Sequence, residues 1–124
     1  MRHGLNVYVA FGLEHPNEYR TIFMSTELEK DPQEFAEQEA RNPCLRVLMM
    51  HVASAIEAGK LKGDVRAIAT MLWTVSHGAI SLLITFPHYP FGEPKTYAQH
   101  VFDAALAGLA TMEVAPLTDQ PSRC

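Results

Sequence analysis

Trp73 and His77 are the residues whose types and spacing point most directly to chemistry. They stand four positions apart, so on a helix their side chains are neighbours on one side. Together they would give a ligand cavity an apolar wall from the indole and a polar handle from the imidazole. The plainer interpretation makes Trp73 a core anchor and His77 a buried, hydrogen-bonded histidine. Either interpretation requires a helix that hides both side chains from water.

Six histidines suggest a metal site, but their spacing does not support one. The sequence has no HExxH motif, no His-x3-His pair, and no glutamate followed three residues later by histidine. His100 and Asp103 would share a metal with His51 or His77 only if the fold brought them together. Enzyme motifs are also missing, because there is no GxSxG and no glycine-rich loop before a helix. We therefore expect no metal, no cofactor and no catalytic residue, and an enzyme is the least favoured class.

The helix that must position the pair contains the stretch 67–86, which holds no Asp, Glu, Lys or Arg. About 20 uncharged residues are long enough to span a bilayer, so a membrane helix is one alternative. Polar and small residues dilute this stretch, however, and no second apolar segment of similar length accompanies it. A buried helix in a soluble protein fits better. If the core of the subunit covers one face, a second copy of the chain most simply covers the other.

Proline, glycine and N-cap residues divide the chain into an all-α fold of about six helices. Pro16, Pro32, Pro43 and Pro94 are typical of helix starts, and Asp64 is the expected N-cap of the long apolar helix. Apolar residues recur at three and four positions throughout, so no strand is expected. The predicted helices span 3–13, 16–26, 32–40, 43–58, 64–86 and 95–112.

Length and composition agree with one domain. The chain has 124 residues, of which 48% are hydrophobic, and a formal net charge of −4. This is the size and composition of a single globular domain, expected over 1–115, with a flexible tail over 116–124. Cys44 and Cys124 form no CxxC pair or metal spacing, a pattern that suits the reducing cytoplasm.

Aromatic and aliphatic residues at helical spacing supply further cavity candidates, although such a stripe is more often plain core. Met and aromatic side chains make a lining that repacks around varied apolar ligands, whereas the candidate positions include no Lys or Arg for an anion. We therefore expect a small hydrophobic effector. The expected ligand-binding residues are Tyr8, Phe11, Phe23, Leu48, Val52, Trp73 and His77.

Four sequence segments resemble the TetR family of bacterial transcription regulators, in the order expected. They are Tyr-x-x-Phe-Gly-Leu-Glu-His-Pro-Asn-Glu-Tyr-Arg (8–20), Ala-Ile-Glu-Ala-Gly-Lys-Leu (55–61), Asp64, and Leu-Trp-x-x-x-His-Gly (72–78). More narrowly, the chain is similar to the C-terminal ligand-binding and dimerisation domain of the branch named for its Trp-His-Gly signature. The similarity runs from about Tyr8 to Ala110.

The resemblance implies a homodimer in which the helices over 64–86 and 95–112 form a hairpin. Two such hairpins make a four-helix interface across a two-fold axis. Small residues on the last helix would let a partner helix approach closely. The alternative is a monomer in which the same hairpin forms part of the internal core. The expected interface residues are Ile80, Leu83, Ile84, Val101, Phe102, Ala105 and Leu109.

A regulator of this type would begin with a helix-turn-helix module, for which the seven residues before Tyr8 leave no room. The negative net charge also has the wrong sign for binding phosphates. DNA is therefore expected to be reached only through a missing N-terminal module. The resemblance implies that a small molecule displaces the first helix and so changes the spacing of two DNA-reading heads. The alternative is a stand-alone helical protein that sequesters a ligand or pairs with a full-length relative.

Overall fold

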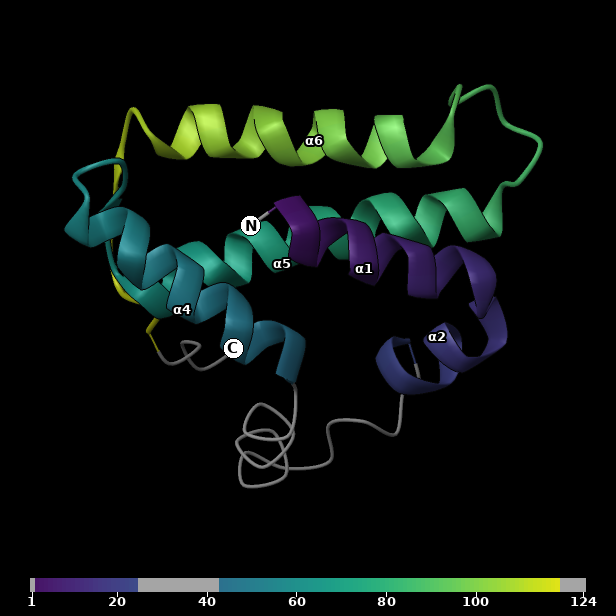
Figure 1. Ribbon diagram of the computed structural model, residues 1–124, viewed down its shortest axis with the longest axis horizontal. Coiled ribbons are helices and arrows are strands. Elements are labelled where there is room, and N and C mark those ends of the chain that lie inside the picture. The colour runs from purple at the N-terminus through teal and green to yellow at the C-terminus, as the bar shows by residue number, and fades with distance from the viewer. Residues whose placement is uncertain (1, 25–42, 119–124) are drawn as a thin grey trace, which may run out of the picture.

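The computed structural model describes residues 2–24 and 43–118, and helices dominate these ranges (Figure 1). The five described helices are α1 (Arg2–Glu14), α2 (Pro16–Phe23), α4 (Pro43–Glu57), α5 (Val65–Thr85) and α6 (Pro94–Leu109). They confirm the corresponding predicted helices to within a few residues at each end. The predicted helix over 32–40 lies outside the described residues, as does most of the predicted tail.

The helix starts follow the predicted chemistry. Pro16, Pro43 and Pro94 are each the first residue of a helix. The N–H that proline lacks would have no helical partner at this position. Asp64 is the N-cap of α5, because its carboxylate accepts a hydrogen bond from the Ala67 amide at 3.0 Å. Glu93 caps α6 in the same way, and hydrogen bonds from the Thr96 side chain and backbone lower the pKa of its carboxyl.

Gly59 ends α4, as is typical of glycine just past a helix C-terminus. Gly59 has a φ of 77°, a conformation that costs glycine little and other residues more. Its amide donates to the Ile56 carbonyl, and the Lys60 amide donates to the Ala55 carbonyl. These two bonds form a Schellman motif, which satisfies carbonyls at the helix end.

α5 is the central helix, and α1, α4 and α6 pack around it (Figure 1). By length and composition it is apolar enough to cross a membrane, but a core helix of a soluble protein passes the same test, and 44% of its most apolar window is buried inside the protein. Its core-facing side includes Ile68, Leu72 and Ile80, all 0% exposed. One side of the charge-free helix α5 therefore packs into the core.

Two short strands contradict the prediction that the chain contains no strand. β1 (Lys62–Gly63) pairs in parallel with β2 (Glu113–Val114), so the chain just before α5 is joined to the chain just after α6. Gly63 has a φ of 127°, and a Cβ there would collide with the Val114 backbone. α6 ends at Leu109 and the chain then turns into β2. The predicted helix over 95–112 therefore extended a few residues too far.

At Gly12, α1 packs closely against Ile80 of α5 and Tyr19 of α2. A Cβ at this position would lie 2.5 Å from Ile80 Cγ2 and 3.3 Å from Tyr19 Cδ2, where no ordinary side chain fits. The missing side chain allows α1 to pack tightly against α5 and α2 at this point. The second half of α1 is therefore fixed firmly in the bundle.

Candidate ligand-binding site

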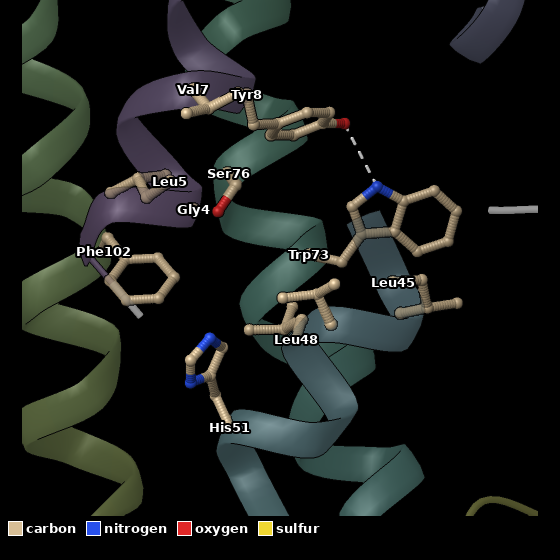
Figure 2. Close-up of a pocket in the computed structure, with 11 residues that line it drawn as sticks. Gly4, Leu5, Val7, Tyr8, Leu45, Leu48, His51, Trp73, Ser76 and Phe102 are labelled. Carbon is tan, nitrogen blue, oxygen red and sulfur yellow. Dashed lines mark hydrogen bonds between the residues drawn. The ribbon is translucent and has the colours of Figure 1, made fainter. Parts of the chain in front are cut away.

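A cavity of about 270 Å³ lies among α1, α4, α5 and α6 (Figure 2). The first half of α1 forms one wall and α4 forms the facing wall, while Trp73 and Ser76 of α5 and Phe102 of α6 line the rest. Nearly all of the lining is aliphatic or aromatic, as in typical small-molecule sites. The lining residues are Gly4, Leu5, Val7, Tyr8, Leu45, Val47, Leu48, His51, Trp73, Ser76 and Phe102.

Three residues expected to bind a ligand lie together at this cavity: Tyr8 from α1, Leu48 from α4 and Trp73 from α5. The Trp73 indole Nε1 donates a hydrogen bond to the Tyr8 hydroxyl at 3.1 Å (Figure 2). This bond satisfies the indole N–H and holds the largest side chain of the site against α1. The cavity therefore has a defined aromatic corner.

The other four residues expected at the site lie elsewhere. Val52 is 0% exposed and belongs to the core. Phe23 packs edge-on against Tyr8, with ring centroids 5.5 Å apart, and so supports the cavity from behind. Phe11 packs against His15 and Tyr19, and His77 contacts Tyr19 instead of the cavity.

A chain of hydrogen bonds connects the cavity to His77. The Tyr8 hydroxyl lies 2.9 Å from the Tyr19 hydroxyl, which in turn lies 2.6 Å from Nδ1 of His77. Trp73 and His77 are thus the two ends of one polar connection, which runs through α1 and α2 before it returns to α5. We call these four residues, Trp73, Tyr8, Tyr19 and His77, the polar relay.

The electrostatics of His77 follow from its position. Burial lowers the pKa of its imidazole below the ordinary value of 6.5, because a charged ring loses its hydration there. Neutral imidazole with its proton on Nε2 leaves Nδ1 free to accept the hydrogen bond from Tyr19. His77 is therefore the hydrogen-bonded histidine of the plainer interpretation.

Sequence reasoning missed several cavity residues that lie one helical turn from predicted ones. Leu5 precedes Tyr8 by three positions, Leu45 precedes Leu48 by three, and Ser76 follows Trp73 by three. Residues at this spacing share a helix face, so the signal was present in the sequence. His51 and Val47 complete the α4 wall.

The structure places four of the residues expected at a dimer interface in the core of the subunit. Ile80, Leu83, Phe102 and Leu109 are at most 6% exposed, and Phe102 also lines the cavity. Their side chains are already covered by the helices of the same chain. Ile84, Val101 and Ala105 are half-buried.

Metal-ligating side chains do not gather in the described parts of the chain: residues 2–24 and 43–118 hold no group of three or more His, Cys, Asp or Glu that could bind a metal ion. Asp103, suggested as a partner of His100 in a metal site, instead accepts a hydrogen bond from Gln99 at 2.9 Å. The chemistry at hand in the cavity is therefore the packing of apolar groups with a few hydrogen bonds.

A mostly helical domain with an apolar cavity between its helices has the architecture of a small-molecule-binding domain. The chain belongs to the family of TetR-like C-terminal domains, because the family model described as Tetracyclin repressor-like, C-terminal domain matches residues 1–109. No curated protein and no solved structure matches the chain.

Membership of this family confirms the coarse functional expectations. The family is regulatory and non-enzymatic, and its members are typically the ligand-binding and dimerisation parts of TetR regulators. Dimerisation and effector binding are general properties of the family. TetR regulators are soluble cytoplasmic proteins.

Proposed function

We propose that residues 1–115 form the effector-binding and dimerisation domain of a TetR-type transcription regulator, and that the effector is a small hydrophobic molecule. The Leu72–Gly78 segment supports placing the chain in the Trp-His-Gly branch. The observation that carries the proposal is the apolar cavity between α1, α4, α5 and α6. DNA would be bound by a module outside residues 1–124.

The position of α1 supplies a mechanism. Gly4, Leu5, Val7 and Tyr8 form the α1 wall of the cavity, and they lie in the half of the helix that is remote from the tight crossing at Gly12. A ligand that enters the cavity pushes against this half. A DNA-binding module joined to the start of α1 would move with it, and two such modules in a dimer would then no longer fit successive major grooves.

Binding of a neutral apolar probe tests the cavity. Propylbenzene should change the emission of Trp73, the sole tryptophan, with a saturable dependence on its concentration. Leu48→Glu should abolish this response, because it puts a carboxylate into the apolar lining. Met50→Glu is the matched control, since Met50 lies on the same helix, is 69% exposed and is not part of the lining.

The control variant should respond like the original protein, and circular dichroism should show equal helix content in all three proteins. A response that survives in Leu48→Glu would place the probe elsewhere. No response in the original protein would refute the cavity as the binding site.

The outer face of α5 is the surface that best fits a second subunit. Met71, Val75, Gly78 and Leu82 follow one another at intervals of four, three and four residues, which is the spacing of a helix-packing seam. Met71 and Leu82 are 40% and 45% exposed, unusually high for large apolar side chains on a core helix. On α6 the exposed residues Ala104 and Ala107 are small, which favours close approach of a partner helix.

We therefore propose that the dimer interface still uses the α5–α6 hairpin, but through the outer face of α5 instead of the residues expected from the sequence. A stable homodimer should bury about 1,200–2,000 Å² in total, centred on the α5 seam. Light scattering should report a dimer for the original protein and a monomer for Leu82→Glu, because two carboxylates would meet at the two-fold axis. Met50→Glu should remain dimeric, and a dimeric Leu82→Glu would exclude this face.

A further inference from the structure

The polar groups of the cavity differ in the hydrogen-bonding capacity that they have left. The Trp73 N–H is used by the Tyr8 hydroxyl. Ser76 donates its hydroxyl proton to the Leu72 carbonyl at 2.8 Å, but a hydroxyl oxygen also has lone pairs that accept hydrogen bonds. Ser76 is thus a buried acceptor at the wall of an apolar cavity.

The position of Ser76 makes it a suitable contact for a ligand. It projects from α5 between Tyr8 and Phe102 (Figure 2), and it is only 6% exposed. A polar group this well covered has little water to bind, so a hydrogen bond from a ligand is worth more here than on the surface. His51, which also lines the cavity, is exposed.

The cavity is poorly suited to anionic ligands. The described residues that line the cavity include no Lys, Arg, Asp or Glu. A carboxylate or phosphate would enter an apolar space without a counter-charge, at a high desolvation cost. The volume of about 270 Å³ lies just below the roughly 300–1,000 Å³ of typical ligand pockets, so a single ring with a short substituent is a suitable size.

We propose that the cavity selects a neutral apolar ligand that carries a hydroxyl group, and that Ser76 is the specificity-determining residue because its oxygen accepts the hydrogen bond from that hydroxyl. The inference rests on the proposed function, since it assumes that the cavity binds the effector. A ligand that only accepts hydrogen bonds is disfavoured, because Ser76 would have to give up its bond to the Leu72 carbonyl in order to donate.

The test compares three probes by calorimetry on the original protein and on Ser76→Ala. The probes are 4-propylphenol, which donates a hydrogen bond; 4-propylanisole, which only accepts; and 4-propyltoluene, which does neither. Ser76→Ala should fold, because alanine is the best helix former and the Leu72 carbonyl keeps its helical amide partner. Comparing each probe with itself across the two proteins removes differences in its transfer from water.

Ser76→Ala should weaken the binding of 4-propylphenol by roughly two- to tenfold, the effect of one lost hydrogen bond. The affinities of 4-propylanisole and 4-propyltoluene should stay unchanged, and 4-propylbenzoate should not bind either protein. His51→Ala is the control variant, and it should leave the preference for the phenol intact.

Three results would overturn the inference. If all three neutral probes bind and Ser76→Ala changes none of them, or changes the anisole as much as the phenol, Ser76 does not accept a ligand hydroxyl, while the cavity remains the effector site. If only His51→Ala removes the preference for the phenol, the selecting residue is His51. If no neutral probe binds the original protein, the proposed function fails, and this inference fails with it.

Discussion

Replacing Gly12 with alanine should destabilise the protein, because α1 and α5 cross there without room for a side chain. The added Cβ would lie 2.5 Å from Ile80 Cγ2 and 3.3 Å from Tyr19 Cδ2. Ile80 and Tyr19 are both 0% exposed, and a close-packed interior yields little to an extra methyl group. The methyl group must therefore push α1 away from its neighbours or force side chains out of their preferred rotamers.

The expected magnitude combines two opposing effects. Overpacking costs about 1–3 kcal/mol, whereas replacing glycine by alanine in a helix returns up to about 1 kcal/mol. Gly4→Ala measures the helix-propensity gain alone, because Gly4 lies on the same helix and a Cβ there meets nothing within 4 Å. The free energies of unfolding of the two variants should therefore differ by about 1–3 kcal/mol, with Gly12→Ala the less stable.

Urea unfolding followed by circular dichroism measures this difference. The protein concentration must be the same for both variants, because a dimer is stabilised by mass action. If Gly12→Ala is as stable as Gly4→Ala, the tight crossing of α1 and α5 does not exist in solution, and the fixed half of α1 in the proposed mechanism is lost with it.

Three further variants test the polar relay and the start of α5. Tyr19→Phe removes two hydrogen bonds and should lower the free energy of unfolding by about 1–3 kcal/mol, whereas Tyr89→Phe, at a tyrosine that is 64% exposed, should change it by less than about 0.5 kcal/mol; equal losses would contradict the relay. Burial lowers the pKa of folded His77 below 6.5, so the unfolded state binds more protons below that pH, and the stabilisation present above it is lost as the pH falls. Urea unfolding at about pH 7.5 and pH 5 should show a smaller loss for His77→Asn than for the original protein, and an equal loss would refute this role. Asp64→Ala should cost about 1 kcal/mol through the lost N-cap, while Asp64→Asn should cost less; equal melting temperatures for Asp64→Ala and the original protein would show that the cap contributes nothing.

The helices were predictable because their signals are local. Proline at a first helical position, an Asp64 side chain that caps the amides after it, and Gly59 in a left-handed conformation each act within one turn of their own residue. The β1–β2 pair was not predictable in this way. It joins residues about fifty positions apart, and a two-residue strand carries no period in the sequence.

The candidate site was predicted in part because periodicity shows which residues share a face, but not what that face contacts. Tyr8, Leu48 and Trp73, predicted to bind a ligand, lie at a common cavity. Val52 has the same apolar character and helical spacing, yet it turns into the core. Ser76 was missed although it lies three positions after Trp73 and so shares its helix face, because a serine on an apolar helix does not by itself indicate a ligand contact.

The interface residues were even harder to predict from the sequence, because α5 is apolar on nearly every side. Its sequence alone does not distinguish the face that packs into the core from the face that remains open. Ile80 and Leu83 turn inward, whereas Leu82, which lies between them in the chain, is exposed. Three-dimensional packing separates positions that hydrophobicity treats as equal.

The polar relay links the cavity to Tyr19 and His77, which do not line it. Tyr8 lies at the cavity and is hydrogen-bonded both to Trp73 on α5 and to Tyr19 on α2. A ligand that displaces the first half of α1 would therefore strain the Tyr8–Trp73 bond to α5, and it would keep the Tyr8–Tyr19 bond only if α2 moved together with Tyr8. Breaking them leaves polar groups unsatisfied in the core, at about 1–3 kcal/mol each. Moving α1 and α2 as one unit would keep the Tyr8–Tyr19 bond but would cost the Tyr8–Trp73 and Tyr19–His77 bonds to α5, so these two bonds would resist the displacement that the proposed mechanism requires.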